Sequence, residues 1–309
     1  MGNDGPAWVR VNCPLCGSPD SSLRYPASNG AAATLTADTF RCTAPHLSRH
    51  GDIVCCDRCH LLFSNPQLAP ERMLAIYQAV EDPVYLEEEA ARERTFARSL
   101  RQLHRLTAPP GRLLDVGCYT GVFMKLAARE GWDVTGVELS AWAAAFARRS
   151  GGGPVLSRPL EESGLEARSF DVISLWDVIE HLSRPAFMLK NVHRLLKSGG
   201  IVAISTHRMD SPAARLLGRR YPFLMDMHQV HFSRPTLNRM LQECGFEVLA
   251  WRRHVRVLRL GYFLDKLEKG TRSAPLKKIL GWLSRRKFLR RRFISVGSLG
   301  LANVFARKT

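Results

Sequence analysis

Short apolar runs and amphipathic segments alternate along the second half of the chain. An apolar run closes at Leu114, and a turn rich in small residues follows it at residues 117–121. Residues 122–130 then show a helical pattern, Gly131 stands where a helix C-cap belongs, and a second apolar run fills residues 133–137. Strand, turn, helix and strand in this order predict the opening βαβ unit of a doubly wound parallel sheet.

The alternation continues to the end of the chain and predicts an α/β fold with a Rossmann-like, seven-stranded sheet over residues 108–309. Further strands are expected at residues 154–156, 170–175, 201–205 and 246–251, with a last, antiparallel edge strand within residues 293–306. Residues 70–107 predict a helical linker that breaks near Pro83. Its Tyr77 and Tyr85 are expected mainly to pack between helices, with contact to a neighbouring site as the alternative.

The turn after the first strand is suited to a nucleoside. Gly117 and Gly121 let the backbone approach a ligand at the helix N-terminus. Glu138 ends the second strand, 23 residues after Asp115, where a carboxylate can accept both hydrogen bonds of a ribose diol. A pyrophosphate would require glycine at the position that Tyr119 occupies. A ligand with a ribose and no phosphate, such as S-adenosylmethionine, makes no such demand.

These residues resemble the first motif of class I S-adenosylmethionine-dependent methyltransferases, roughly D-x-G-x-G-x-G. Asp115, Gly117 and Gly121 match it, and Tyr119 departs from it. Residues 170–182 are similar to a second motif of the same family, FDxIxxxxVIEHL. The resemblance implies the seven-stranded fold of that family, S-adenosylmethionine as cofactor, and a cofactor site formed by Asp115, Gly117, Tyr119, Gly121, Glu138, Leu139, Leu160, Glu161, Trp176 and Asp177.

Two pairs of these residues take their roles from the family alone. Leu160 and Glu161 match the segment that contacts adenine, where Pro159 replaces the usual acid and a backbone contact is expected. Trp176 and Asp177 follow the fourth strand and are expected to flank the amino-acid end of the cofactor. The family also uses the region of residues 70–107 as a lid.

The N-terminal part of the chain has the spacing of a metal site. Cys13 and Cys16, and Cys56 and Cys59, form two C-x-x-C pairs, whose gap lets both thiolates of a pair face one tetrahedral zinc ion. We therefore expect a structural zinc ion on these four cysteines, in a module of residues 1–69. The long gap between the pairs leaves alternative ligands, and free buried cysteines are the other reading; the alternative ligands are Cys42, Cys55, His46, His50 and His60.

A second resemblance concerns residues 53–66, IVCCDRCHLLFSNP. They are similar to the second knuckle of a zinc ribbon that precedes certain bacterial methyltransferases, some of which methylate nucleotide-linked deoxysugars on carbon. His60 departs from that family, which usually has glycine there. The resemblance extends over nearly the whole chain and implies a small-molecule acceptor, with a nucleotide- or lipid-linked sugar of cell-envelope or natural-product synthesis as the favoured class.

Three histidines are candidate catalytic bases. Residues 206–232 occupy the position of the acceptor-binding segment in this fold and contain His228 and His231, while His181 follows the fourth strand. Histidine titrates in the range needed to take a proton from an acceptor. Related sugar C-methyltransferases place a histidine and a tyrosine in this segment, which favours His228. For His231, packing before the helix cap at Ser233 is the alternative.

The net charge of +17 is concentrated near the C-terminus. Residues 251–292 contain 15 Lys or Arg and two acids. Within them, Leu276, Ile279, Leu280 and Leu283 recur at helical spacing, surrounded by basic residues, and predict an amphipathic helix in an insert at about residues 259–292. Such a helix suits an anionic membrane surface or a lipid-linked substrate, packing on the sheet, or the phosphates of RNA, in that order of preference.

Two rival functions remain open. An RNA methyltransferase would use the zinc module and the basic insert, although the fourth strand lacks the Asn/Asp-Pro-Pro-Tyr sequence of amine methylation. A non-catalytic binding protein could also retain this fold. No apolar run approaches the roughly 18 residues of a membrane span, and no signal-like segment opens the chain. We therefore expect a cytoplasmic enzyme, with peripheral contact to the inner membrane surface through the insert.

Overall fold

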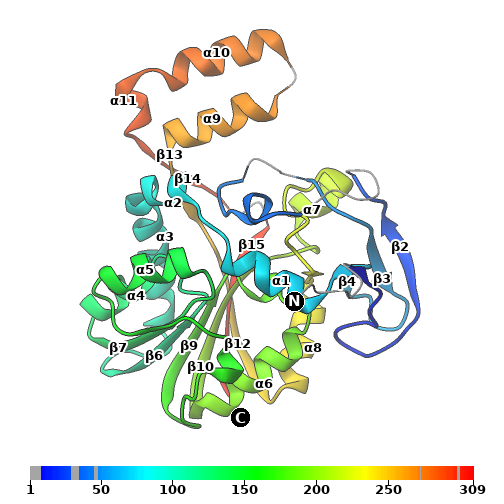
Figure 1. Ribbon diagram of the computed structural model, residues 1–309, viewed down its shortest axis with the longest axis vertical. Coiled ribbons are helices and arrows are strands. Elements are labelled where there is room, and N and C mark those ends of the chain that lie inside the picture. The colour runs from blue at the N-terminus through cyan, green and yellow to red at the C-terminus, as the bar shows by residue number, and fades with distance from the viewer. Residues whose placement is uncertain (1–7, 29–34, 45–47, 272, 298–299) are drawn as a thin grey trace, which may run out of the picture.

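The central sheet of this protein has seven strands in the order β12-β15-β10-β9-β6-β7-β8 (Figure 1). The computed structural model describes residues 8–28, 35–44, 48–271, 273–297 and 300–309. Strands β8, β7, β6, β9 and β10 are parallel to one another, whereas β15 is antiparallel to β10 and β12. The strands of the sheet are β6 (Gly111–Val116), β7 (Trp132–Val137), β8 (Val155–Leu156), β9 (Phe170–Trp176), β10 (Leu196–His207), β12 (Phe246–Arg253) and β15 (Leu301–Lys308). The predicted α/β fold with seven strands is confirmed.

The last strand lies in a different place from the one predicted. We expected an edge strand within residues 293–306, but β15 lies between β10 and β12, and β12 forms the edge. Residues 301–306 are all buried, as a strand covered on both faces requires. The first part of the predicted range belongs to another strand, β14 (Phe293–Val296), which pairs with β13 (Arg256–Arg259) outside the sheet.

Helices cover both faces of the sheet, and adjacent residues of each strand point to opposite faces. Leu113 packs with α3 (Glu89–Leu103), α4 (Val122–Arg129) and α5 (Ala141–Arg149), whereas Leu114 packs with α6 (Pro185–Leu195) and α8 (Arg234–Glu243). Val172 and Ile173 of β9 divide between the same two layers. The sheet therefore has a separate hydrophobic core on each of its two faces.

The linker ahead of the sheet forms three helices, α1 (Pro70–Gln78), α2 (Pro83–Glu87) and α3. The predicted break near Pro83 is confirmed, because Pro83 is the first residue of α2. A second break at Glu88 separates α2 from α3. These helices bring Tyr77 and Tyr85 against the carboxyl end of the sheet.

The N-terminal cysteine module contains strands β2 (Ser21–Tyr25), β3 (Ile53–Cys56) and β4 (Leu62–Ser64) and the short helix η1 (Ala37–Phe40). Its sheet has the order β11-β4-β3-β2, and β11 (Val230–His231) comes from the segment that follows β10. Val230 pairs with Phe63, and His231 pairs with Leu62. A separate pair, β1 (Trp8–Val9) with β5 (Gln67–Leu68), joins the two ends of the module. The module and the predicted acceptor segment thus share one sheet.

The basic insert stands away from the sheet on the ribbon that β13 and β14 form (Figure 1). It consists of α9 (Leu260–Gly270), α10 (Ala274–Ser284) and α11 (Lys287–Arg290). The remaining short elements are α7 (Pro212–Leu217), η2 (Leu160–Glu162), η3 (Ile179–His181) and η4 (Gly218–Arg220). Among the described helices, none combines the length and the apolar character that crossing a bilayer requires.

The helix predicted in the insert is present, but its packed stripe differs from the predicted one. Leu280 is buried, whereas Leu276 is 44% and Ile279 is 56% exposed. The stripe that is buried includes Gly281 and Ser284. A Cβ at Gly281 would meet the Glu268 carboxylate of α9 at 2.9 Å, so α9 approaches where α10 has its smallest residue. This close approach turns Ile279 outward.

Candidate functional site

The turn between β6 and α4 has a backbone that few residues other than glycine adopt. Gly117, Tyr119 and Gly121 all have left-handed φ values, of 72°, 49° and 80°. A Cβ at Gly117 would lie 2.7 Å from the Val178 side chain, and one at Gly121 would lie 2.9 Å from the Cα of Ala147. Glycine is therefore required at both positions by conformation and by space.

Two buried carboxylates lie at the carboxyl ends of β6 and β7, beside this turn. Glu138 accepts hydrogen bonds of 2.8 Å from the backbone N–H groups of Tyr119 and Ser140. Asp115 accepts one of 2.6 Å from the Ser174 hydroxyl. Burial raises the pKa of Glu138, and burial, with Glu138 nearby, raises the pKa of Asp115 to about 7. Neither carboxylate forms an ion pair with a described residue, so a ligand with hydroxyl or ammonium groups would find two acceptors there.

Aromatic side chains surround the same turn. The Tyr119 ring lies 4.3 Å from that of Tyr85 and 6.2 Å from that of Trp142, measured between ring centroids. The Tyr119 hydroxyl and the Trp176 Nε1 are buried without a partner among the described residues. The structure therefore brings Tyr85 of the linker onto a predicted cofactor residue, as in the alternative to the favoured prediction of helix packing.

Asp177 lies at the end of β9 and is already paired. It has a left-handed φ of 55° and accepts a hydrogen bond of 2.7 Å from the Ser205 hydroxyl. Arg256, at the base of the insert, forms an ion pair with its other oxygen. Although burial opposes ionisation, Arg256 and His254 hold the pKa of Asp177 well below its usual range. No sequence motif indicated Arg256 as a partner, because 79 residues separate it from Asp177.

The predicted adenine segment is divided between core and surface. Leu160 is buried in the core on the α6 side of the sheet, Leu139 is half-buried, and the Glu161 side chain is exposed. The backbone contact expected at Glu161 stays a prediction.

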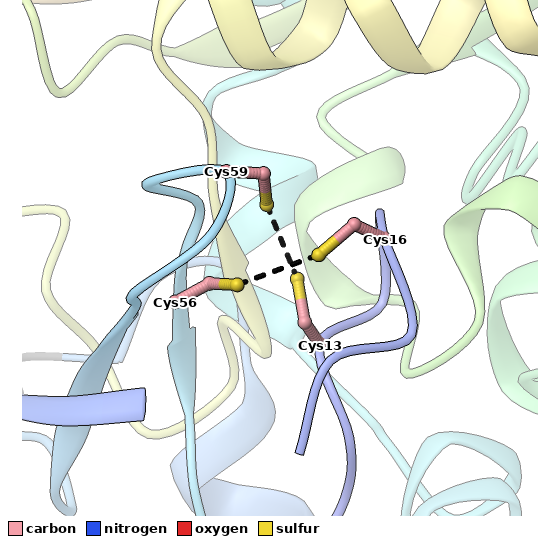
Figure 2. Close-up of side chains that lie close together, drawn as sticks. All are labelled: Cys13, Cys16, Cys56 and Cys59. Atoms are coloured by element: carbon pink, nitrogen blue, oxygen red, sulfur yellow. Dashed lines mark hydrogen bonds between the residues drawn. The ribbon is translucent and has the colours of Figure 1, made fainter. Parts of the chain in front are cut away.

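The four cysteines of the two C-x-x-C pairs converge (Figure 2). The Sγ atoms of Cys13 and Cys59, and those of Cys16 and Cys56, are 3.4 Å apart. Four thiolates fit tetrahedral zinc, whose sulfur ligands lie about 3.7 Å from one another when each is about 2.3 Å from the ion. Of the alternative ligands, Cys42, Cys55, His50 and His60 lie outside the cluster, and His46 lies outside the described residues.

The two cysteine turns have matching backbones. Gly17 follows Cys16 with φ 71°, and His60 follows Cys59 with φ 60°. His60 thus takes a left-handed conformation that glycine adopts more readily.

A cluster of buried histidines lies on the acceptor side. The three predicted candidates, His181, His228 and His231, come together with His207, the last residue of β10. The His207 ring stacks on that of His228 at 4.8 Å, and its Nε2 lies 3.1 Å from Nδ1 of His231. Burial lowers the pKa of His228 and His231 well below 6.5, so both are neutral at pH 7.

Two further side chains complete this cluster. The Tyr77 hydroxyl lies 2.8 Å from Nδ1 of His181, and the buried Glu180 has its Oε1 3.7 Å from Nδ1 of His207. We did not predict a role for His207 or Glu180 from the sequence. His207 nevertheless ends a parallel strand, and ligands in this fold class bind at the carboxyl ends of such strands. The position of His207 at the end of this strand could therefore have predicted it as a site residue.

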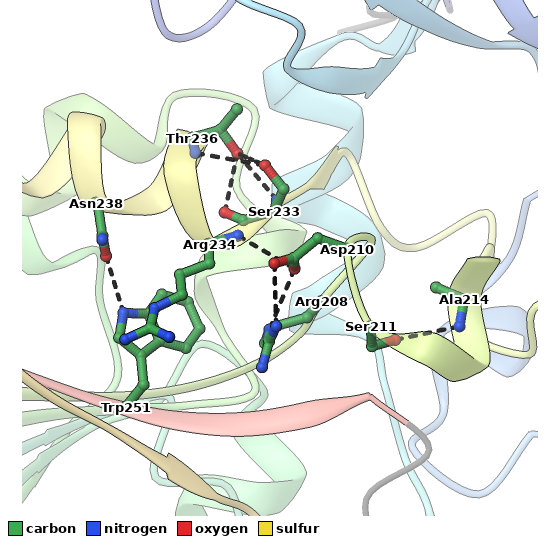
Figure 3. A network of polar contacts seen from close by, with 9 residues as sticks. All are labelled: Arg208, Asp210, Ser211, Ala214, Ser233, Arg234, Thr236, Asn238 and Trp251. Atoms are coloured by element: carbon green, nitrogen blue, oxygen red, sulfur yellow. Dashed lines mark hydrogen bonds and ion pairs between the residues drawn. The ribbon is translucent and has the colours of Figure 1, made fainter.

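Polar contacts fix both ends of the segment that carries these histidines (Figure 3). Asp210 accepts hydrogen bonds from the Arg208 guanidinium, at 3.1 and 3.0 Å, and from the backbone N–H of Arg234. Ser211 caps α7 and Ser233 caps α8 through their hydroxyl oxygens. The segment is therefore anchored before and after the histidines.

Comparison with known proteins places most of this site in one family. A family model described as a methyltransferase domain matches residues 88–250. The ubiquinone biosynthesis O-methyltransferase of Pseudomonas aeruginosa (strain UCBPP-PA14) is 30% identical over 150 residues, which cover 44% of this chain and 65% of that protein. The protein of the same name from Sodalis glossinidius (strain morsitans) is 32% identical over 127 residues, covering 38% and 51%. This chain thus spans less than two thirds of the length of these relatives.

Solved structures are also similar. The 1,6-didemethyltoxoflavin-N1-methyltransferase of Burkholderia thailandensis, with bound 1,6-didemethyltoxoflavin and S-adenosylhomocysteine, has a TM-score of 0.49 and 20% identity, covering 82% of this chain and 97% of that one. A possible histamine N-methyltransferase from Thermotoga maritima has a TM-score of 0.47 and 20% identity, covering 72% and 91%.

Proposed function

The chain belongs to the methyltransferase-domain family, whose model covers more than half of it, and from this premise we propose that it transfers a methyl group from S-adenosylmethionine to a small acceptor. The observation that carries the proposal is the pair of buried carboxylates, Asp115 and Glu138, beside the left-handed turn at Gly117 and Gly121. The ribose hydroxyls of the cofactor would donate hydrogen bonds to these carboxylates, and its ammonium group would supply a positive charge beside them.

Each predicted cofactor residue has a place in this proposal. Glu138 binds the ribose, and Asp115 accepts from the amino-acid end directly or through water. The backbone of Gly117, Tyr119 and Gly121 passes beneath the nucleoside. Leu139, Leu160 and the backbone of Glu161 border adenine, and Trp176 and Asp177 border the methionine end.

Ligand specificity tests this proposal directly. A bound pyrophosphate would require glycine at the position that Tyr119 occupies. S-adenosylhomocysteine should therefore raise the temperature of thermal unfolding, and NAD should not. ATP serves as a second phosphate-bearing control. Stabilisation by NAD equal to that by S-adenosylhomocysteine would contradict the proposal.

The acceptor side follows from the histidine cluster. His228 donates from Nδ1 to the carbonyl oxygen of Phe223 at 2.7 Å, which leaves the lone pair on Nε2. We assign to this nitrogen the promotion of proton loss from an acceptor oxygen or carbon, with His181 and His231 lining the same region. His228 is only 4% exposed, and such burial favours a small acceptor over an RNA chain.

The finer identity of the acceptor rests on the zinc-ribbon resemblance. We propose a nucleotide- or lipid-linked sugar methylated on oxygen or carbon, and a structural zinc ion on Cys13, Cys16, Cys56 and Cys59. The relatives named above act, by their names, in ubiquinone biosynthesis, so a quinone precursor is the comparison substrate in any acceptor screen.

We also propose that the basic insert docks on an anionic membrane surface, where a lipid-linked acceptor would be found. Ile279, Trp282 and Phe288 are 56%, 57% and 67% exposed. Arg286 lies 4.3 Å above the Trp282 ring, and Arg292 lies 4.3 Å above the Phe288 ring. Exposed apolar side chains among cations match a surface of anionic headgroups over acyl chains.

A further inference from the structure

We propose that His207, His228 and His231 bind a divalent transition-metal ion on the acceptor side, at a site separate from the four cysteines. One ring nitrogen from each histidine lies within 4.8 Å of one from each of the others. All three rings are buried. The proposal rests on the proposed function in that the ion would face the acceptor, and Nε2 of His228 would then promote proton loss through the ion that it binds and not as a free base.

The backbone around the three histidines is held at several points. Ser64 of β4 donates from its N–H to the Gln229 carbonyl at 2.9 Å and from its hydroxyl to the His228 carbonyl at 3.0 Å. The N–H of Gln229 donates to the Glu180 carbonyl at 2.8 Å. His207 is fixed by the pairing of β10 with β15. Ligands on separate elements are thus oriented before an ion arrives, as a tight metal site requires.

Polar atoms without partners are concentrated in this cluster. Nδ1 of His207, Nε2 of His231 and Oε2 of Glu180 are buried, and none has a hydrogen-bond partner among the described residues. Buried polar atoms are nearly always paired in native proteins, and several unpaired ones together point to a missing charged group. The buried Glu180 carboxylate lies beside the three imidazoles, and a buried negative charge there favours a cation as the group that binds.

The hydrogen-bonding pattern assigns the ligand atoms. A metal-binding histidine usually donates its other N–H to a carbonyl or carboxylate. His228 does so from Nδ1 to the Phe223 carbonyl, and the Nδ1 of His207 faces Glu180 at 3.7 Å. Nε2 of His207 and Nδ1 of His231 are 3.1 Å apart. Two nitrogens on one tetrahedral zinc ion are about 3.3 Å apart, so this pair fits one edge of a coordination shell.

A second possible grouping shares His228 but combines it with Glu180 and His181. In that grouping Nδ1 of His181 already contacts the Tyr77 hydroxyl at 2.8 Å. The set of three histidines leaves that contact intact, and an ion bound to it would replace the hydrogen bond between Nε2 of His207 and Nδ1 of His231.

Three histidine ligands leave one position open, unlike the closed set of four cysteines. An acceptor hydroxyl that binds there would have its pKa lowered and would release its proton to solvent. The oxygen lone pair then forms the bond to the methyl carbon, and the carbon–sulfur bond breaks with its electrons going to sulfur. The products are the methyl ether, S-adenosylhomocysteine and one proton.

Cobalt(II) substitution of the full-length protein separates the two metal sites. Cobalt on the cysteines gives intense near-ultraviolet thiolate bands, whereas cobalt on histidines gives none. We expect two equivalents of cobalt or zinc per chain in the wild type and one in each of His207→Gln, His228→Gln and His231→Gln, with the thiolate bands unchanged. Cys16→Ser should lose those bands and retain the histidine-bound ion.

His181→Gln and His254→Gln are the controls, since both alter buried or half-buried histidines outside the proposed ligand set, and both should retain two equivalents. One equivalent in the wild type after loading with excess metal, or two equivalents in every histidine variant, would overturn the proposal. Calorimetry of S-adenosylhomocysteine on the same samples distinguishes the outcomes. Cofactor binding with one metal ion would refute the ion alone, and two metal ions without cofactor binding would refute the proposed methyl transfer alone.

Discussion

Asp115 shows how one buried carboxylate shapes this site. It is 2% exposed, accepts a hydrogen bond from Ser174, and forms no ion pair with a described residue. Burial raises its pKa from the ordinary 3.8 to about 7. A carboxylate held in this way is a cost to folding that a bound ligand can offset.

Asp115→Asn should therefore stabilise the protein in a pH-dependent manner. The folded pKa lies above the unfolded value, so the wild type loses stability as the pH rises from about 4 through 7. The neutral amide avoids this loss, and the variant should gain about 2–4 kcal/mol in free energy of unfolding at about pH 8 and almost nothing at about pH 4. Urea unfolding at both pH values measures the difference.

The control is Asp133→Asn, because the Asp133 side chain is 74% exposed. It should change the free energy of unfolding by less than about 0.5 kcal/mol at either pH. An equal effect of Asp115→Asn at both pH values would show that the Asp115 carboxylate is not the titrating group.

The sequence predicted those residues whose role depends on local spacing. Gly117, Gly121 and the four cysteines belong to short motifs, and the left-handed φ values and the thiol cluster follow from them. His207 and Arg256 act through partners that are 24 and 79 residues away. No local pattern encodes such pairs, because the fold alone brings them together.

At the scale of elements, the pairing of β4 with β11 connects the cysteine module to the histidine segment. His231 lies in β11 and pairs with Leu62 of β4, and His228 lies two residues before this strand. The turn between β6 and α4 belongs to the other, seven-stranded sheet. The module should therefore support the acceptor side more directly than the cofactor side, where Phe40 and Leu68 share a hydrophobic cluster with Tyr119.

Removal of zinc tests this connection. Cys16→Ser should lower the free energy of unfolding by about 3 kcal/mol or more, a fall in Tm of roughly 6–12 °C, because structural zinc sites contribute folding energy directly. Affinity for S-adenosylhomocysteine in the folded fraction should change by less than about threefold. Zinc content, thermal unfolding and calorimetry provide the measurements.

Cys55→Ser is the matched control, because Cys55 lies in β3 beside Cys56 but outside the cysteine cluster. It should retain zinc and the wild-type Tm. If Cys16→Ser kept a full complement of zinc, the proposed ligand set would be wrong.

Periodicity predicted whether a segment is a helix or a strand, but it did not predict which other elements that segment packs against. The apolar pattern located α10, but the stripe that packs was set by the small residue Gly281 facing α9. Likewise, residues 301–306 were predicted as part of a strand, and their complete burial placed that strand inside the sheet instead of at its edge.

At the scale of the whole molecule, charge and shape combine at the insert. Its base is tied to the linker helices: Arg259 binds the buried Glu88 at 2.6 Å, and Thr95 accepts from the Val257 N–H at 2.8 Å. Its helix α10 lies far from the sheet (Figure 1) and carries Ile279 and Trp282, whose side chains are exposed. The sequence located the charge, and the structure added the outward direction of Trp282 and Phe288.

Vesicle sedimentation tests the membrane proposal. The wild type should bind phosphatidylglycerol vesicles and bind phosphatidylcholine vesicles at least about tenfold more weakly, with affinity falling as salt rises. The double variant Trp282→Ala with Phe288→Ala should bind the anionic vesicles at least about 100-fold more weakly, since each buried aromatic ring contributes about 1.5–3 kcal/mol and every 1.4 kcal/mol is about tenfold.

Leu216→Ala provides the control, because Leu216 is 87% exposed but lies on α7, outside the insert. It should bind like the wild type. Equal binding to neutral and anionic vesicles, or a similar loss in Leu216→Ala, would refute docking through the insert.

The most direct test of the central proposal is calorimetric titration of the wild type, Glu138→Ala and Glu130→Ala with S-adenosylhomocysteine. Glu130 is an exposed acid at the end of α4 and serves as the control. We expect about micromolar binding by the wild type and by Glu130→Ala, and an affinity about 10- to 100-fold weaker in Glu138→Ala, which loses hydrogen bonds to a charged group. No binding by folded wild type, or wild-type affinity in Glu138→Ala, would contradict a cofactor site built on this carboxylate.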